Sequence, residues 1–524
     1  MTERTARLAV LSIASLFVLW GLCYIYRTSA VVAGSRMFLL WDDGMISMRY
    51  ARNLAEGHGL TWNGDAEKVQ GITNLGLTLL MALIHLLPVS RWHTSLLYQL
   101  LSLAMATACL PLVYRLAIAL FRERAVGVAV CVTTALYAPF PIWSLQGADV
   151  PAVALPVLAA VVKVVEADRS GQPWPGTSFV LLALAILVRP DASVAYAVVL
   201  AFCAWREGTG ARAFRRGCLL LLATGAGLLA FGYFYYGDPL PNTYYLKATG
   251  SPRLLVLESG LRQTLAFVAV VSPLLIVLLL AAVAPRLRRD RALALTVTVV
   301  LAAFLYNVWV GGDWIDRLVS RFLAPVMPMF ITLLMGAWWA VCRALGEGVV
   351  RAASWLFAVG ALAIALQVNP PGALAEWLLF ETETLYKEKN VAQARLGLYL
   401  RDLTDPGTTV AFHWAGTAAY LGERPGIDVL GKSDRHIAKM TVDRFIPAHS
   451  KWDWDYVIAE RRPDVFVEQT RGLLRRADFN AAYRAARTGE GEWIFVRRGS
   501  EPKLHDPKIA YVEIGSLREP GEAP

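Results

Sequence analysis

The sequence predicts a polytopic α-helical membrane protein that carries a soluble α/β domain at its carboxyl end. Of its 524 residues, 56% are hydrophobic and only 18% are charged, a balance too apolar for a soluble protein. Runs such as 8–24, 219–235 and 265–283 approach the roughly 20 apolar residues that cross a bilayer as a helix. From about Asn369 the composition becomes that of a soluble chain.

Short clusters of arginine and lysine separate the apolar runs, and such clusters are typical of cytoplasmic loops. The clusters are Arg115, Arg122 and Arg124; Lys163 and Arg169; Arg206, Arg212, Arg215 and Arg216; Arg286, Arg288, Arg289 and Arg291; and Arg343 and Arg351. Alternation from a cytoplasmic amino terminus predicts about eleven spans and an extracytoplasmic carboxyl terminus. The predicted spans are 8–26, 94–119, 125–145, 150–166, 177–189, 192–206, 217–236, 264–284, 292–311, 321–342 and 350–368.

The formal net charge of +10 resides in these clusters and does not form one basic stripe, so it does not indicate nucleic-acid binding. The first apolar run follows Arg4 and Arg7 and has no small-residue cleavage site, so we expect it to be retained as a span. All six cysteines lie in or beside apolar runs, which predicts neither a disulfide framework nor a metal site.

The largest predicted outer loop is 27–93. Its stretch 75–87 is apolar but too short to cross a bilayer, and counting it as a span would break the charge alternation. We therefore expect this stretch to lie at the outer interface. The remaining outer segments are predicted at 146–149, 189–191, 237–263 and 311–320. Because the inner loops are short and rich in arginine, we expect any chemistry on the outer face.

Three parts are predicted along the chain: a membrane part at 1–368, an extracytoplasmic α/β domain at 369–500, and a loosely held tail at 501–524 that is rich in Pro, Glu and Gly. Within the α/β domain, strands are predicted at 408–414, 426–430, 463–468 and 492–497, and helices at 391–403 and 454–461.

The strongest motif is the acidic pair Asp42-Asp43 in the first outer loop. Apolar positions 46, 50, 51 and 54 follow it at helical spacing, so the pair begins a predicted amphipathic helix at the interface. Two interpretations stay open. In the first, the carboxylates only cap the helix, because its amino end stabilises ionised carboxylates. In the second, one of them is a catalytic base.

Further candidates lie in or beside the predicted outer segments, the first outer loop included. Cations suited to a phosphate are Arg189, Lys247, Arg317 and Arg321, and the alternative for each is an interfacial anchor. Polar and aromatic candidates for a sugar or an acceptor are Asn242, Tyr244, Asp313, Trp314, Asn74, Asp149 and His58. A helix cap is the favoured alternative for Asp149, and packing is the favoured alternative for His58. His413, His436 and His449 are too scattered for a metal site.

Several motifs match a known family. They are Asp42-Asp43 with 49–60; Asn63 and 71–74; 189–191; 236–245; 311–314 with Arg321-Phe322; and 427–431 before Asp434 and 436–438. With these motifs the chain resembles the GT-C membrane glycosyltransferases, and among them proteins similar to the mycobacterial terminal β-(1→2) arabinofuranosyltransferase. It departs from that pattern at Gly44-Met45, at Gln70 and at Ile72, and it lacks a Gly-Leu-Glu-Thr motif.

The resemblance implies a polyprenyl-phosphate sugar donor, with arabinofuranose as the candidate sugar, and inversion at the anomeric carbon. It also implies a glycan or lipid acceptor outside a bacterial plasma membrane. We expect no cofactor besides the lipid-linked donor, and the sequence shows no spacing of metal ligands. Carried over by position, Asp42 or Asp43 is the base. Independently of the resemblance, we expect the four cations named above to hold the phosphate.

A transporter or flippase of lipid-linked saccharide is the alternative from another class. It would predict ionisable residues deep inside the spans and two repeated halves. The acids and lysines lie instead at the ends of the apolar runs, and the chain shows no internal repeat.

Overall fold

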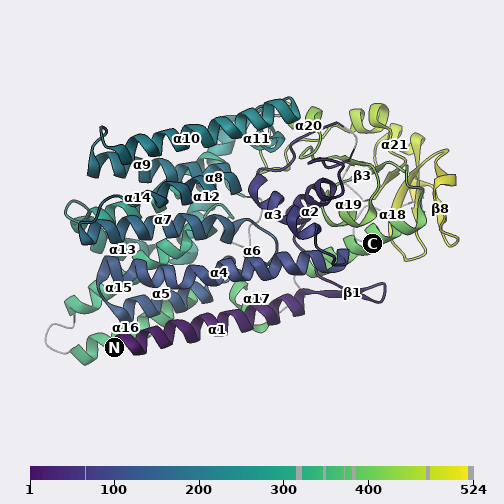
Figure 1. Ribbon diagram of the computed structural model, residues 1–524. Helices are drawn as coiled ribbons and strands as arrows, with labels where there is room; N and C mark the ends of the chain where they lie inside the picture. The colour runs from purple at the N-terminus through teal and green to yellow at the C-terminus, as the bar shows by residue number, and fades with distance from the viewer. Residues whose placement is uncertain are drawn as a thin grey trace.

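The protein consists of a bundle of long helices and a domain built on a six-stranded sheet, which lies at one end of the bundle (Figure 1). The computed structural model describes residues 1–64, 67–313, 321–345, 350–370, 372–380, 385–467 and 472–516. The predicted fold class, a polytopic helical membrane protein with a carboxyl-terminal soluble domain, is confirmed.

Seven helices of the described residues are long and apolar enough to cross a membrane. They are α1 (Glu3–Thr28), α4 (Arg91–Phe121), α7 (Val150–Ser170), α10 (Arg212–Phe231) continued by η2 (Gly232–Tyr236), α12 (Arg253–Val271), α14 (Arg291–Trp309), and η3 (Ala324–Val326) continued by α15 (Met327–Leu345).

Shorter helices complete the bundle. The pair α5 (Arg124–Leu136) and α6 (Pro139–Leu145) could form one further span, bent by 51°. The others are α8 (Thr177–Val188), η1 (Pro190–Ala192), α9 (Ser193–Glu207), α13 (Pro273–Leu287) and α16 (Val350–Gln367).

The predicted spans fall on these helices, but 177–189, 192–206 and 350–368 fall on α8, α9 and α16, which are not among the seven helices long and apolar enough to cross a membrane. At 264–284 the prediction was wrong. That run is divided between the end of α12 and the start of α13. Ser272 separates them with a φ of 82°, and Pro273 follows it. A proline keeps the preceding residue out of the α-helical region, so the helix breaks although the hydropathy continues.

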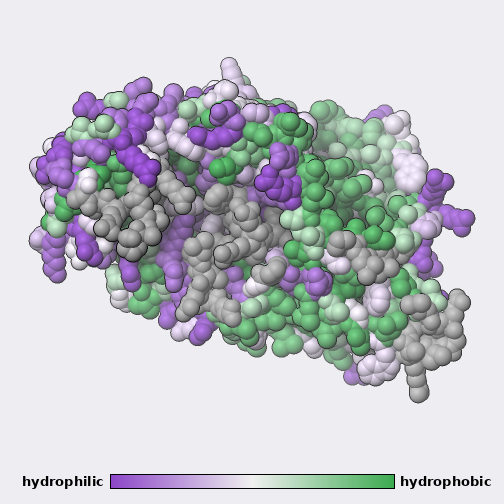
Figure 2. Space-filling model, turned by 180° about the vertical axis from the view of Figure 1, so that it is seen from behind, coloured by the Kyte–Doolittle hydropathy of each residue, from purple (hydrophilic) through white to green (hydrophobic). Residues whose placement is uncertain are grey.

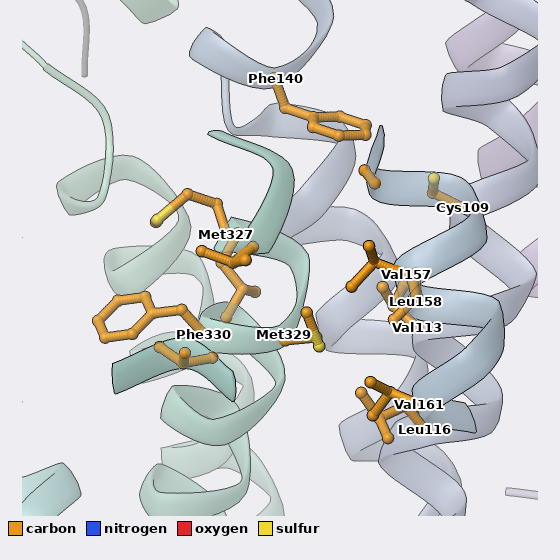
Figure 3. Packing of buried hydrophobic residues seen from close by; sticks show 14 of the residues in the cluster. Cys109, Val113, Leu116, Phe140, Val157, Leu158, Val161, Met327, Met329 and Phe330 are labelled. Carbon is orange, nitrogen blue, oxygen red and sulfur yellow. The ribbon is translucent and has the colours of Figure 1, made fainter. Parts of the chain in front are cut away.

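The core of the bundle is formed by α4, α7 and α15 together with α6 (Figure 3). Buried residues of this cluster labelled in Figure 3 are Cys109, Val113, Leu116, Phe140, Val157, Leu158, Val161, Met327, Met329 and Phe330. The Phe330 ring packs on the other side of α15, against Phe267 of α12 and Phe304 of α14. Close packing of this kind is a main source of attraction between helices in lipid, where the hydrophobic effect does not drive helices together. The outside is apolar too: hydrophobic residues cover most of the helical part in Figure 2, while hydrophilic ones gather over the sheet domain.

The first outer loop lies between the bundle and the sheet domain (Figure 1). It contains the hairpin β1 (Ala30–Val32) and β2 (Ser35–Met37), then α2 (Asp42–Ala55) and α3 (Leu75–His85). The 11 residues of α3 span only ~16 Å, too short for a ~30 Å hydrocarbon core. The structure thus agrees with the prediction that this stretch is not a span.

The sheet domain has strand order β4-β3-β5-β7-β6-β8, with β3 parallel to β4 and β5 and the other pairs antiparallel. Its strands are β3 (Val410–Phe412), β4 (Gly426–Asp428), β5 (Val465–Phe466), β6 (Tyr483–Arg487), β7 (Trp493–Arg497) and β8 (Ala510–Val512). Its helices are α18 (Leu385–Leu403), α19 (Thr417–Gly422), α20 (Arg435–Lys439), η4 (Tyr456–Arg461), α21 (Ala477–Ala482), η5 (Glu501–Lys503) and η6 (Ile514–Ser516).

Four predicted strands are found as β3, β4, β5 and β7, but the predicted limits of the domain need two corrections. The tail that was expected to be loose supplies β8, which pairs with β6. At the other limit, α17 (Ala373–Leu379) belongs to the bundle: the Trp20 indole of α1 donates a hydrogen bond to the Trp377 carbonyl at 2.8 Å.

The sheet domain also covers α2, which is therefore buried on nearly every side and does not lie on a membrane surface as predicted. Arg49 and Arg52 of α2 donate hydrogen bonds to the carbonyls of Ala419 and Tyr420 near the carboxyl end of α19. Asp42 accepts one from the Gly416 N–H at the amino end of α19. Both ends of α19 thus meet the charge that its dipole favours.

Candidate active site

A cavity of about 610 Å³ lies at the amino end of α2, where the bundle, the first outer loop and the sheet domain meet. Its charged lining residues are Asp43, Asp149, Arg189, Lys247, Arg321 and Lys432. Five of these were predicted site residues. The fold brings them together from positions up to 389 residues apart.

The two carboxylates of the acidic pair point to different partners, because successive helix residues are rotated by about 100°. Asp42 Oδ1 accepts the Gly416 N–H at 2.9 Å and so faces the sheet domain. Asp43 lines the cavity. Its Oδ2 accepts from Arg321 Nη1 at 2.6 Å, and its Oδ1 forms an ion pair with Lys432.

The pair also differs in electrostatics. Burial raises the pKa of Asp42 to about 6. Burial acts on Asp43 in the same direction, but Lys432 and Arg321 outweigh it and hold the pKa of Asp43 well below its usual range. Asp43 is thus ionised in this arrangement, and a proton is held by it only weakly.

Arg321 is fixed by a second acid. Its Nε and Nη2 donate to Asp313 at 2.7 and 3.2 Å, while Nη1 donates to Asp43. Such a two-pronged contact fixes the plane of a guanidinium as well as its position. The Asp313 backbone is held in turn, because its N–H donates to the Gln263 side chain at 2.7 Å.

Thr243 and Lys247 of α11 (Asn242–Ala248) line the cavity. They lie on one face of the helix, because they are four positions apart. The Lys247 ammonium makes no ion pair or hydrogen bond with the residues that the structure describes. Burial, with Arg321 nearby, lowers its pKa to about 8. The hydroxyl of Thr243 is buried without a hydrogen-bond partner among the described residues. Lys247 and Thr243 are therefore equipped to bind an anionic oxygen.

Arg189 lines the cavity but is already paired with two acids. It contacts Asp149 at 2.9 Å and Asp191 at 3.0 Å, and its guanidinium lies 4.5 Å from the centre of the Phe322 ring. Asp149 is thereby used to hold Arg189, whichever of its predicted roles it has. Asn74 also lines the cavity, and its side-chain oxygen accepts a hydrogen bond from Ser47 at 3.2 Å.

Of the predicted sugar or acceptor residues, Tyr244 and Asp313 line an adjoining cavity, and two others line neither. The Asn242 amide donates to the carbonyls of Gly431, Lys432 and Asp434 at 2.8 to 3.0 Å, so it supports the loop that carries Lys432. His58 is exposed beyond the carboxyl end of α2, roughly 20 Å of helix away from Asp43. Trp314 and Arg317 lie outside the described residues.

Sequence reasoning missed Lys432 and Thr243. Lys432 directly follows the motif 427–431, which was noticed, but nothing local to it indicates that its loop returns to α2. Thr243 stands between two residues that were chosen and carries no charge to single it out.

Further cavities adjoin the first, and two of them bear on its chemistry. One, of about 1090 Å³, shares Lys247 and Thr243 with it and is also lined by Tyr244, Tyr306, Trp309 and Asp313. The other, of about 850 Å³, is mainly apolar and lies between α3, α8 and α10. Among the described residues, no group of three or more His, Cys, Asp or Glu side chains is arranged to hold a metal ion.

Comparison with known proteins adds the following. A family described as Domain of unknown function (DUF8728) matches residues 383–508, which is most of the sheet domain. No match to a curated protein is found.

Solved structures give clearer likenesses. ArnT from Cupriavidus metallidurans in the apo state has a TM-score of 0.51 at 14% identity, over 82% of this chain and 89% of that one. The same protein bound to undecaprenyl phosphate also gives 0.51 at 14%, over 80% and 85%. The apo oligosaccharyltransferase of Archaeoglobus fulgidus gives 0.50 at 12%, over 96% and 76%. The chain therefore has the GT-C glycosyltransferase fold.

Proposed function

We propose that the protein is an inverting glycosyltransferase that moves a sugar from a polyprenyl-phosphate donor to an acceptor hydroxyl outside the membrane. One observation carries this proposal: an acidic residue, Asp43, shares a cavity with the cations Lys247, Arg321 and Lys432, beside an apolar groove between helices of the bundle. The fold supports it, since one similar structure is that of ArnT bound to undecaprenyl phosphate.

The donor phosphate fits best against α11. Lys247 supplies a charge that no described acid neutralises by direct contact, and the Thr243 hydroxyl supplies an unused donor. The polyprenyl tail would then leave through the apolar groove. Leu75, Ile186, Leu187, Leu221, Leu228 and Leu229 line that groove.

Asp43 is the better placed base of the acidic pair. It lines the cavity, whereas the Asp42 carboxylate holds the backbone of the sheet domain. In the transfer, Asp43 takes the proton of the acceptor hydroxyl as that oxygen attacks the anomeric carbon and the bond to phosphate breaks. A phosphate is a good leaving group, so cations that stabilise it replace the acid of a hydrolase.

The sugar fits the larger cavity, where aromatic rings and an acid lie close to Lys247. Tyr244, Tyr306 and Trp309 offer ring faces, and Asp313 is an acceptor for hydroxyl groups. Following the family resemblance, arabinofuranose is the first sugar to test, and a cell-envelope glycan or lipid the first acceptor.

The positive charges at the far end of the bundle support an extracytoplasmic site. Contacts among the arginine-rich loops place these loops at one common end: Arg115 pairs with Glu166, Arg124 with Glu3, Arg169 with Asp290 and Arg206 with Asp168. In Figure 1 the amino terminus marks that end, opposite the sheet domain. Loops rich in arginine stay in the cytoplasm, so the cavity would face outward.

The test is to incubate the purified protein with a panel of polyprenyl-phosphate sugars and to measure which one loses its sugar. We expect one to be consumed in the presence of an envelope acceptor. If none is consumed but lipid-linked saccharide crosses the membrane of reconstituted vesicles, the protein is a transporter and the proposal is wrong.

A further inference from the structure

The Lys432–Asp43 ion pair joins the sheet domain to the first outer loop inside the cavity. Both side chains are shielded: the Lys432 side chain is 14% exposed and that of Asp43 29%. Lys432 lies in the segment matched by the family of unknown function. The sheet domain thus contributes one of the cations that line the cavity.

The backbone that carries Lys432 is held from two sides. The Asp428 carboxylate accepts the N–H groups of Leu430, Gly431 and Ser433 at 2.8 to 3.2 Å. The Asn242 amide donates to carbonyls of the same loop, including that of Lys432. The loop itself is therefore fixed, and only the flexible side chain of Lys432 can change its position.

The two cations on Asp43 differ in their freedom. Arg321 is clamped by Asp313 through two nitrogens and reaches Asp43 with the third. For Lys432, Asp43 is the only ion-pair partner in the described part of the chain. Of the two, Lys432 is the cation that can leave Asp43 without breaking another contact of its own.

The proposed reaction moves negative charge across this cavity. The donor is a phosphodiester with one negative charge, and the polyprenyl phosphate product carries close to two. As the phosphate–sugar bond breaks and the acceptor–sugar bond forms, the acceptor proton passes to Asp43 and cancels its charge. One unit of negative charge therefore disappears at Asp43 while one appears on the phosphate, and the total is unchanged.

We propose that Lys432 changes partner during this reaction: it holds the Asp43 carboxylate while the cavity is empty and neutralises the leaving phosphate when Asp43 takes the acceptor proton. This inference rests on the proposed function. Lys432 thus keeps the base occupied until a phosphate is present, which makes donor binding precede acceptor activation. The pKa of Asp43, held low by Lys432 and Arg321, rises as Lys432 moves away.

Other charged groups face Asp43 and must be counted in any pH dependence. Those that the structure describes are Asp42 on α2, Lys247 on α11, Asp313 and Arg321 beside the bundle, and Lys432 and His449 on the sheet domain. Because several of them act together, a single pH profile cannot isolate Lys432. A double-mutant cycle can.

The cycle measures the binding of undecaprenyl phosphate to the purified protein in nanodiscs. Asp43→Asn removes the competing carboxylate, so we expect it to tighten binding by about tenfold. In a Lys432→Met background the gain in affinity should fall below about threefold, because the Lys432 ammonium that Asp43→Asn frees for the phosphate is absent. Lys508→Met, at an exposed lysine of the same domain, should leave the full gain.

Each outcome bears on the inference. If Asp43→Asn tightens binding equally with and without Lys432, Asp43 repels phosphate by its field alone and the exchange is wrong. If Lys432→Met fails to fold, Lys432→Arg is used instead, because it keeps the charge. The gain in affinity from Asp43→Asn should persist in the Lys432→Arg background, and a loss of that gain would also overturn the exchange. If neither the parent protein nor Asp43→Asn binds undecaprenyl phosphate, the proposed function itself fails.

Discussion

At the scale of single residues, the site depends on which polar groups are already satisfied. Arg189, Arg321 and Lys432 each have an acid partner, whereas Lys247 has none among the described residues and Thr243 lacks any hydrogen-bond partner there. A phosphate entering the cavity therefore meets the unengaged groups of α11 first. This ordering leads to two predictions.

The first concerns pH. Because the pKa of Lys247 is lowered to about 8, its charge is complete below that pH and is lost as the pH rises through it. We expect the affinity for undecaprenyl phosphate to fall above pH 8. In Lys247→Arg, which stays charged, this alkaline fall should disappear. An unchanged alkaline fall in Lys247→Arg, measured by titration in nanodiscs, would assign it to another group.

The second concerns Thr243→Val, which removes the unpartnered hydroxyl at nearly constant shape. Stability should not decrease, since no hydrogen bond within the protein is lost. The KM for the donor should rise roughly three- to tenfold if the hydroxyl binds phosphate. A lower unfolding temperature with unchanged KM would show that Thr243 only supports the fold.

Residue types and the predicted outer segments were sufficient to name the pair Asp42-Asp43, Lys247, Arg321 and Asp313 as candidates, without deciding between the two acids of the pair. They could not give the role of Asn242, whose amide bonds to a loop 189 positions away. Lys432 was missed for the same reason. Long-range partners of this kind depend on tertiary structure, which a single sequence pattern does not encode.

At the scale of elements, α2 is the part that joins the two halves of the protein. Its Asp42 meets the amino end of α19, and its arginines meet the carbonyls at the other end. The Arg49 side chain also donates to the carbonyls of Trp62 and Arg424 and lies 4.3 Å from the centre of the Trp62 ring. Together these contacts fix α2, and with it Asp43, against the sheet domain.

Arg49→Met should therefore destabilise the protein by about 2–4 kcal/mol, because buried carbonyls lose a charged donor. The midpoint of thermal unfolding in detergent measures this loss. Arg395→Met, at an exposed arginine of α18, is the matched control and should change the midpoint little. Equal midpoints for the two variants would contradict the role given to Arg49.

Periodicity found α2 and four of the strands, but two kinds of element escaped it. Strand β6 contains Ala485 and Ala486, which have low strand propensity, and is stabilised by pairing with β7 and β8. The break between α12 and α13 was missed because the run stays apolar across Ser272. The amphipathic pattern of α2 could not show that the sheet domain would cover its polar side.

At the scale of the whole molecule, charge alternation located the long apolar helices but predicted eleven spans, whereas seven described helices, or eight if the pair α5 and α6 is one span, are long and apolar enough to cross a membrane. The arginine-rich loops are joined by ion pairs at one end of the bundle, which lies opposite the sheet domain in Figure 1. Composition could not predict how the sheet domain contacts the helical bundle. The prediction of a loose tail at 501–524 was wrong at β8, which escaped notice because it is short and lies in a polar stretch.

Orientation in the membrane yields a labelling prediction. A cysteine introduced by Lys508→Cys on the sheet domain should react with a membrane-impermeant maleimide on intact bacterial cells. One introduced by Arg288→Cys at the other end should react only after the cells are opened, and the parent chain gives the background of the native cysteines. The reverse pattern would place the cavity in the cytoplasm.

In the proposed reaction, Asp43 is the base of a sugar transfer from a lipid phosphate. The most direct measurement is the single-turnover rate of transfer, from whichever polyprenyl-phosphate sugar the parent protein consumes, in Asp43→Asn and Asp42→Asn. We predict a loss of about 10²- to 10⁴-fold for Asp43→Asn and a much smaller one for Asp42→Asn, with donor still bound by both. Transfer at the parent rate by folded Asp43→Asn would contradict the claim.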